Sequence, residues 1–414
     1  MAVVTQNLWA KPGSIRIPGG ADIPFWGFAT TAGREPQLPG PTITARVGDL
    51  IRINLRNDLQ DFVSLVFPGQ DTIPAPVKNN GQFVSYNTHA SPGGTVQYSF
   101  GAVRPGVFLY ESGTNPERQV PMGLYGAIVV YPAEDGFERT AYGENTGTGF
   151  DVEKLLVLSE IDTRFNQATE AGRQFNLLDF SPDYWLVNGR SFPHTLLPDS
   201  TYFLPGQPVS AKINCVSGQR VLLRCINAGV QNHTFRLGET TPRVVAVDSR
   251  PLNANGSLDA TYLRNTLTVA SGESYDLILT AGATGQRYLH DRDVTHLCNT
   301  GQFPGGMATR LDVMIWIPWF APPAPWLLNC RESGGSIHLS WINWATNVEG
   351  FVVERRTLTS GFQVIAVLVV PGMTFYVDNT VEPSTTYIYR IRAYNANGFS
   401  GYSNHYPVRT GSVV

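Results

Sequence analysis

Short alternations of apolar and polar residues, interrupted every few positions by Gly or Pro, constrain the fold of this chain most. In TITARVGDLIRINLRNDL (residues 42–59) the alternation predicts two strands with Gly48-Asp49 as the turn between them. GTVQYSFGAV (94–103) and GLYGAIVVY (123–131) predict further strands. No amphipathic pattern longer than a few helical turns stands out. The sequence therefore predicts an all-β chain.

The composition supports short strands and several domains. The chain has 414 residues, with 41 Gly, 29 Pro and only 15% charged residues. Such a length exceeds one ordinary hydrophobic core and predicts two to four domains. The net charge of −3 gives no electrostatic reason to expect nucleic acid as a partner. The most apolar stretches have the length of strands, so no membrane span is expected.

Composition shifts divide the chain into three β-rich segments. We expect the first over residues 1–132 and the second over 151–318. Between them, 133–150 is polar and aperiodic, which is typical of a linker or an exposed loop. The Pro-rich run at 319–325 predicts a semi-rigid linker before the last segment, 326–414.

The last segment combines Trp341 in an early strand with GFVVERR (350–356) and TTYIYRIRAYNANGFSGYSN (385–404). This pattern resembles a fibronectin type III module, which implies a third β-sandwich acting as a spacer or an adhesive unit. Trp341 and Tyr387 are expected to pack in its core.

The first two segments carry a second resemblance. PGPTITARVGDLIRINLRNDL (39–59) and PGVFLYESGTNPERQVPMGLYGAIVVYP (105–132) resemble the first cupredoxin domain of multicopper oxidases. LLVLSEID (155–162), QRVLLRCINAG (219–229) and GQFPGGMATRLDV (301–313) resemble the second. The resemblance implies two tandem cupredoxin-like Greek-key β-sandwiches before the fibronectin-like module. It also implies an extracytoplasmic location (secreted, periplasmic or cell surface), although residues 1–18 show no signal-peptide pattern.

The copper ligands that this family implies are missing. Its three-copper cluster is held by paired His-x-His motifs, and their positions correspond here to Val66, Pro68 and Glu111. None of the seven histidines forms a His-x-His pair. We therefore predict degenerate cluster positions, no catalytic residue and no bound cofactor, with copper as the alternative.

A single blue-copper site needs two histidines, a cysteine thiolate and usually a methionine. His233, His296, Cys298 and Met307 are the best candidates, but residues 299–306 lack the histidine expected between Cys and Met. The simpler interpretation is a turn before the last strand, with Met307 in the core.

HDRDVTH (290–296) holds the densest group of metal-ligand side chains: His290, Asp291, Asp293 and His296. Either these side chains converge on a metal ion, or the segment is a solvated loop whose acids pair with arginines. A disulfide between Cys215 and Cys298 is left open.

The first hypothesis for function is a non-catalytic, extracytoplasmic binding or assembly protein, such as a surface-layer or filament subunit. Protein partners or self-assembly are expected, and residues 2–11 could add a strand to a neighbour's sheet. The alternative is a copper-dependent oxidoreductase with an unconventional or subunit-completed site. A third hypothesis, glycan binding, relies on exposed aromatic rings at Trp9, Trp26 and Trp319.

Overall fold

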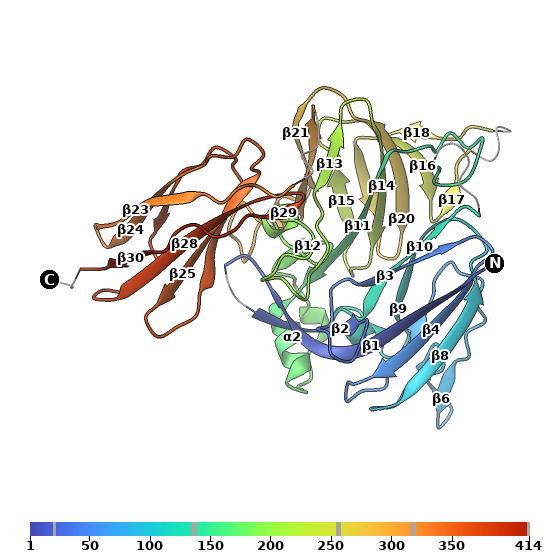
Figure 1. Cartoon of the computed structure of the whole chain (residues 1–414). Coiled ribbons are helices and arrows are strands. Elements are labelled where there is room, and N and C mark those ends of the chain that lie inside the picture. The colour runs from blue at the N-terminus through green and yellow to red at the C-terminus, as the bar shows by residue number, and fades with distance from the viewer. Residues whose placement is uncertain (20–21, 134–138, 254–257, 316–319, 412–414) are drawn as a thin grey trace. The chain divides into compact units, whose positions relative to one another are not determined.

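The computed structural model describes residues 1–19, 22–133, 139–253, 258–315 and 320–411. Strands dominate it, so the predicted all-β class is confirmed (Figure 1). The chain forms two compact units: Met1–Thr195 with Leu204–Trp316, and Leu196–Phe203 with Ile317–Val414. The start of the predicted Pro-rich linker, including Trp319, and part of the predicted linker, 134–138, lie outside the described residues.

The first β-sandwich consists of two four-stranded sheets. One has the order β2 (Asp22–Ala29), β1 (Val3–Arg16), β4 (Leu50–Asn57), β8 (Thr95–Gly101). The other has the order β3 (Gly40–Arg46), β10 (Tyr125–Tyr131), β9 (Gly106–Ser112), β5 (Leu65–Val66). Inward-facing residues of both sheets, such as Leu8, Ile53 and Tyr110, fill the core between them.

Strand β1 is paired on both sides over only part of its length. Residues 3–10 pair with β4, whereas the pairing with β2 begins at Trp9 and runs to Arg16. The expectation that residues 2–11 add a strand to another chain stays a prediction. The sheet ends at β2 and β8.

The second sandwich has larger sheets. One has the order β12 (Tyr184–Val187), β11 (Val152–Ile161), β14 (Arg220–Asn227), β20 (Ser274–Thr280), β16 (Arg243–Val247), β17 (Arg250–Pro251), with β18 (Tyr262–Leu263) also on β16. The other has the order β13 (Ile213–Val216), β22 (Ala308–Met314), β21 (Gly285–Asp291), β15 (His233–Arg236), β19 (Thr266–Val269).

The two sandwiches share a hydrophobic core. Val107, Leu109 and Val129 of the first pack in one cluster with Ile226 and Ala228 of the second. Helix α2 (Thr163–Glu170) adds polar contacts: its Glu170 carboxylate accepts a hydrogen bond from the Trp26 indole at 2.8 Å. Trp26 is therefore buried and is not the exposed ring that glycan binding requires.

The described part of the predicted linker, 139–150, is not exposed throughout. Ala141, Tyr142 and Phe150 are buried and form a small cluster with Leu222 and Ala246. The Tyr142 hydroxyl donates to the Asp276 carboxylate at 2.6 Å. This stretch therefore packs against the second sandwich, although the domain boundaries drawn from the sequence stay a prediction.

The remaining helical and hairpin segments are short. They are α1 (Pro116–Gln119), the 3₁₀ turns η1 (Leu177–Asp179), η2 (His194–Leu196) and η3 (Val294–Leu297), and the hairpin β6 (Val77–Asn79)–β7 (Gln82–Ser85). No helix in the described ranges is long and apolar enough to cross a membrane.

The C-terminal unit is a third sandwich. Its sheets have the orders β23 (Trp326–Ser333), β24 (Ser336–Ile342), β27 (Phe375–Asp378) and β26 (Gln363–Leu368), β25 (Gly350–Thr357), β28 (Thr386–Asn395), β29 (Gly398–Phe399), with β30 (Tyr406–Arg409) also on β28. Trp341 and Tyr387 lie in its core, as expected. Its fibronectin type III identity stays a prediction.

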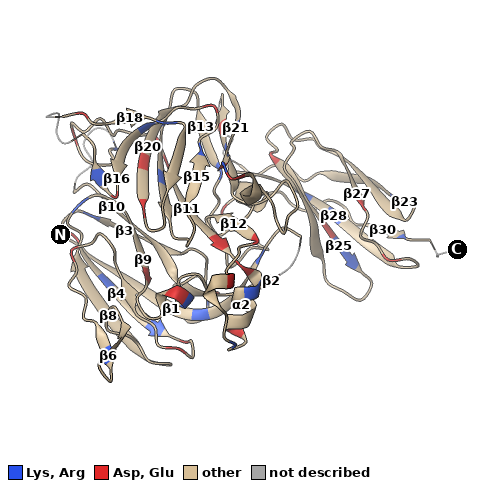
Figure 2. Cartoon of the chain, turned by 180° about the vertical axis from the view of Figure 1, so that it is seen from behind, with Lys and Arg blue, Asp and Glu red and all other residues tan. Residues whose placement is uncertain are grey.

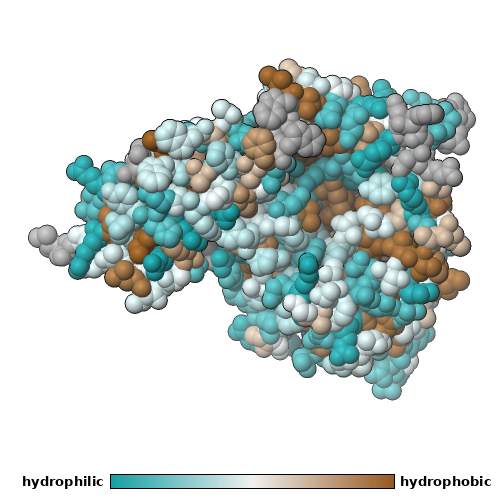
Figure 3. Space-filling view, in the orientation of Figure 1, coloured by the Kyte–Doolittle hydropathy of each residue, from teal (hydrophilic) through white to brown (hydrophobic). Residues whose placement is uncertain are grey.

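The surface is mixed in charge and in hydropathy. Lys and Arg are interspersed with Asp and Glu over the strands (Figure 2). Hydrophobic side chains are scattered among hydrophilic ones over the face shown in Figure 3. Scattered exposed apolar residues are normal for a folded protein.

Candidate metal centre

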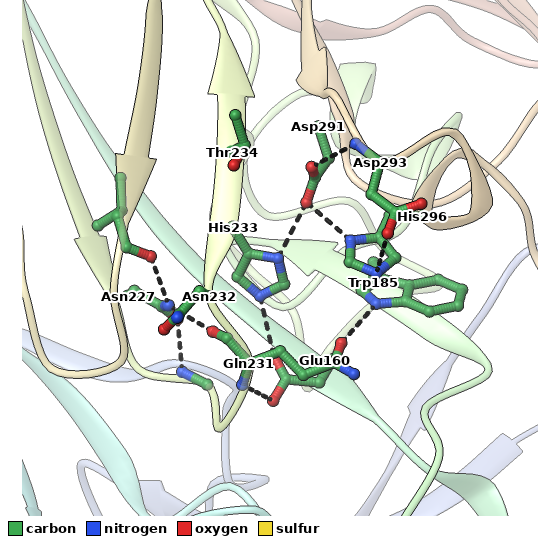
Figure 4. Close-up of polar contacts among 12 residues, drawn as sticks. Glu160, Trp185, Asn227, Gln231, Asn232, His233, Thr234, Asp291, Asp293 and His296 are labelled. Carbon is green, nitrogen blue, oxygen red and sulfur yellow. Dashed lines mark hydrogen bonds and ion pairs between the residues drawn. The ribbon is translucent and has the colours of Figure 1, made fainter.

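Four titratable side chains from separate elements meet inside the second sandwich (Figure 4). Glu160 comes from β11, His233 begins β15, Asp291 ends β21, and His296 belongs to η3. Ligand atoms of His233, Asp291 and His296 all lie within 4.8 Å of one another. We call these four residues the His–acid cluster.

Hydrogen bonds connect the cluster in a chain. The Asp291 carboxylate lies 3.0 Å from His233 Nδ1 and 2.8 Å from His296 Nδ1. The other ring nitrogen of His233, Nε2, lies 3.0 Å from the Glu160 carboxylate. The backbone N–H of Asp293 donates to the second oxygen of Asp291 at 2.9 Å.

The strand pattern explains why His233 points inward. Along β15, His233 and Phe235 are buried, whereas Thr234 and Arg236 are only half-buried. This is the two-residue period of a strand with one face on the core. The antiparallel pairing of β15 with β21 then places Phe235 opposite Asp291, and brings the end of β21 beside His233.

A local turn returns His296 to the same place. The Asp293 side chain accepts from the N–H of Thr295 at 3.0 Å and so caps η3. The short 3₁₀ turn directs His296 back toward Asp291. The imidazole then stacks on the indole of Trp185, with ring centroids 4.5 Å apart.

Glu160 is the member that the sequence analysis missed. Its carboxylate accepts from the backbone N–H groups of Val230 at 2.5 Å and Gln231 at 3.0 Å. A Cβ atom on Gly229 would overlap this carboxylate, so glycine leaves the space that Glu160 occupies. The only sequence signal was an acidic residue late in the apolar strand KLLVLSEID.

Burial makes the electrostatics of the cluster strong. The side chains of Glu160 and Asp291 are each 1% exposed, and that of His233 is fully buried. Among the contacts of the described residues, neither carboxylate has a Lys or Arg partner. Buried carboxylates require compensation by positive charge, which here can come only from protonated imidazoles or from a bound cation.

The pKa values follow from this arrangement. Burial lowers the pKa of His233, but hydrogen bonds to Asp291 and Glu160 outweigh it and raise the pKa to about 9. Burial raises the pKa of Asp291, but hydrogen bonds from His233 and His296 lower it to about 2. Without metal, His233 therefore carries the positive charge between two carboxylates at neutral pH.

Profiles of one family match both sandwiches. One family model described as "Multicopper oxidase" matches residues 27–135, and a second model with the same description matches residues 161–310. The chain belongs to the multicopper oxidase family. The two matches lie one after the other, each in one of the sandwiches.

Individual relatives agree with this assignment. "Laccase-3" of Oryza sativa subsp. japonica is 25% identical over 259 residues, which cover 61% of this chain and 40% of the laccase. "L-ascorbate oxidase" of Brassica rapa subsp. pekinensis is 25% identical over 269 residues, which cover 59% of this chain and 42% of that protein. The chain thus spans less than half the length of these curated relatives.

Solved structures show the same fold. The blue copper oxidase from Nitrosomonas europaea has a TM-score of 0.60 at 22% identity, covering 76% of this chain and 86% of that one. The copper nitrite reductase from the same organism has a TM-score of 0.57 at 19% identity, covering 75% and 94%.

A three-copper cluster does not fit this chain. Strand β5 pairs with β9 so that Val66 lies opposite Glu111, and Pro68 is exposed beyond the strand. The positions where a multicopper oxidase needs paired imidazoles are thus neighbours in space, but they carry no imidazole. Ser64, next to them, hydrogen-bonds to Ser85 at 2.9 Å instead.

The blue-copper hypothesis is only half met. His233 and His296 come together, but among the described residues Cys298 does not belong to the group of converging ligand atoms. Met307 is fully buried in the hydrophobic core of the second sandwich, because the residue precedes the inner strand β22. Cys298 ends η3 and leads into the turn at Asn299.

Of the four candidate ligands in the HDRDVTH segment, two join the cluster and two do not. Asp291 and His296 enter the cluster, which excludes the simple solvated loop. The His290 imidazole instead lies 2.7 Å from the Asp291 carbonyl oxygen. The Asp293 side chain is 53% exposed and approaches His296 Nε2 only at 3.6 Å, so it is a cap for η3 rather than a buried ligand.

The cysteines do not form the disulfide left open by the sequence. All four are free thiols. Cys215 lies inward on β13 in the core, with its sulfur 3.8 Å from the Asp312 carbonyl oxygen, whereas Cys298 belongs to the turn after η3. Burial raises the pKa of Cys215 to about 11 and that of Cys225 to about 12, so both thiols are unreactive at neutral pH.

Proposed function

We propose that this chain binds one copper ion at the His–acid cluster and acts as a copper-dependent oxidoreductase with an unconventional, mononuclear site. The observation that carries the proposal is the convergence of two imidazoles and two carboxylates, all buried, without a Lys or Arg partner among the described residues. Family membership makes copper the first metal to test.

The donor set suits a divalent transition metal. Imidazole nitrogens and carboxylate oxygens bind Cu²⁺ and Zn²⁺, and for a given N/O site Cu²⁺ is generally bound most strongly of the divalent series. His233, Asp291 and His296 would hold the ion, with Glu160 as the hydrogen-bond partner of His233 Nε2. Bound copper would supply one-electron redox chemistry, without the thiolate that gives blue-copper sites their colour.

The surrounding residues would orient the donors. The backbone N–H groups of Val230 and Gln231 fix the Glu160 carboxylate, and that of Asp293 fixes Asp291. Trp185 covers one face of His296, and its indole N–H donates to the Gln231 side chain at 3.0 Å. Such outer contacts hold ligands in place and keep water away from the site.

Loading with copper and spectroscopy test the proposal. We expect the copper-loaded protein to show an electron paramagnetic resonance signal with nitrogen couplings and no intense blue absorption. It should oxidise a one-electron donor such as a phenol or a metal ion. Conversion of Asp291 to Asn should abolish both the signal and the activity, whereas Asp293→Asn should keep them.

A non-catalytic role is the second candidate. It is supported by the loss of imidazole at Val66, Pro68 and Glu111, which leaves the fold intact without the oxygen-reducing cluster. Under this proposal the protein acts outside the cytoplasm by binding a protein or a glycan, or by self-assembly. A chain that binds no copper, yet forms particles of defined mass above that of the monomer, would favour this candidate.

A further inference from the structure

A cleft of about 650 Å³ lies close to the His–acid cluster. It is of the size that small-molecule sites usually have. Its lining includes Glu111 on β9, Glu117 on α1, Leu177 on η1, Phe180, and Val230 in the loop that follows β14.

The charged side chains that line the cleft are all acidic. Glu111 and Glu117 contribute carboxylates, and none of the described residues that line it is Lys, Arg or His. Glu117 is exposed at the surface, whereas Glu111 is half-buried on β9. In the part of the chain that the structure describes, the Glu111 carboxylate has no recorded hydrogen bond or ion pair. Partial desolvation raises the pKa of Glu111 above its ordinary value.

The other polar groups of the cleft are already used. The Asn227 side chain donates to the carbonyl oxygens of Gln231 and Val269 and accepts from the N–H of Gly229. The Ser271 hydroxyl donates to the Gly229 carbonyl oxygen at 2.5 Å. The half-buried Glu111 carboxylate therefore remains as the polar side chain that a ligand would engage.

Apolar side chains form the rest of the wall. Leu177 is 45% exposed and Val230 54% exposed, although both are large hydrophobic residues. Phe180 and Val120 are half-buried beside them. A ligand that covers these groups gains hydrophobic free energy in addition to any ion pair.

We propose that this cleft binds a small organic cation, with a primary ammonium group on Glu111 and an apolar or aromatic body against Leu177, Phe180 and Val230. An ammonium ion would form a charge-assisted hydrogen bond with this half-buried carboxylate. The proposal does not depend on copper, because Glu111 is not part of the His–acid cluster.

Calorimetric titration of the metal-free protein tests the proposal with three probes of similar shape: 2-phenylethylammonium, 2-phenylethanol and phenylacetate. We expect the ammonium ion to bind at least about tenfold more tightly than the alcohol, and the carboxylate not to bind. Equal binding of all three would mean an apolar cleft without charge selectivity, and would overturn the proposal. So would the absence of binding by the ammonium ion.

Substitutions at three lining residues locate the site. Glu111→Gln should weaken ammonium binding about tenfold or more, whereas Glu117→Gln, at the exposed rim, should change it about twofold. If Glu111→Gln does not fold, Val230→Lys provides the second test. It places a cation at the mouth of the cleft, leaves the backbone N–H to Glu160, and should abolish ammonium binding. Wild-type ammonium affinity in folded Glu111→Gln or in folded Val230→Lys would contradict the assignment.

Discussion

At the scale of single residues, the His–acid cluster depends on two carboxylates that water does not reach. Isolated buried carboxylates are costly, so their presence requires a positive partner. His233 supplies one in the metal-free state, since its pKa is raised to about 9. A divalent ion on the Nδ1 side of His233 would compensate Asp291 directly, while the Nε2 proton of His233 would still be donated to Glu160.

Gly229 gives a precise test of the support around Glu160. Conversion to Ala should displace the Glu160 carboxylate, because the new Cβ would overlap it, and should lower copper affinity about tenfold. Gly282→Ala is the matched control, since a Cβ there has no neighbour within 4 Å. Competitive titration against a chelator measures the copper affinity of both variants. Equal affinity in the two variants would show that Glu160 does not take part.

Asp291 has the central place, because both histidines bond to it. Asp291→Asn keeps the shape of the side chain but removes the charge, and should lower copper affinity by at least about a hundredfold. The control is Asp293→Asn, which changes the half-exposed side chain that caps η3. This substitution should lower copper affinity by less than about threefold. The reverse order of the two effects would point to a surface site instead.

At the scale of elements, the sequence predicted strands far better than it predicted the cluster. Alternation such as that of residues 42–59 indicates β3 and β4 directly, because side-chain direction has a period of two. The cluster instead depends on which strands become neighbours. HDRDVTH was recognised as ligand-rich, but its junction with His233 requires the β15–β21 pairing.

Glu160 shows more clearly why the cluster could not be predicted from the sequence. It lies in the opposite sheet from His233, 73 residues earlier in the chain. No local pattern distinguishes it from an ordinary acidic residue near the end of a strand. Likewise, Trp26 is buried by tertiary contacts with the core of the first sandwich and hydrogen-bonds to Glu170 of α2, which composition alone could not reveal.

Helix α2 provides a prediction for the elements around the cluster. Its N-cap Asp162 accepts from the N–H groups of Arg164 and Phe165, and also from that of Ser181. Asp162→Ala should destabilise the first unit by about 1 kcal/mol or somewhat more. Thermal unfolding measures this, with Asp179→Ala as an exposed control of the same charge change. An unchanged midpoint would contradict the capping role.

At the scale of the whole molecule, the chain consists of two units with separate hydrophobic cores. Units with their own cores generally unfold as separate cooperative transitions. We therefore expect two transitions in calorimetry, and a substitution in the C-terminal core should move only one of them.

Asp378 is the suitable position in the C-terminal unit. Burial raises the pKa of Asp378, but hydrogen bonds from Tyr389 and Thr380, together with Arg355, outweigh this and hold that pKa below its ordinary value. A lowered folded-state pKa stabilises the unit above about pH 4, and this stability is lost as the pH falls through the folded-state value. Asp378→Asn should remove that acid-dependent loss and cost on the order of 3 kcal/mol at neutral pH. An unaltered pH profile of this transition would contradict the prediction.

Copper content per chain tests the central claim most directly. Elemental analysis of copper-loaded, extensively dialysed protein should give one copper per chain for the wild type and none for a His233→Gln, His296→Gln double variant that keeps the wild-type circular dichroism. Either no retained copper in the wild type, or one copper retained by the folded double variant, would contradict the account.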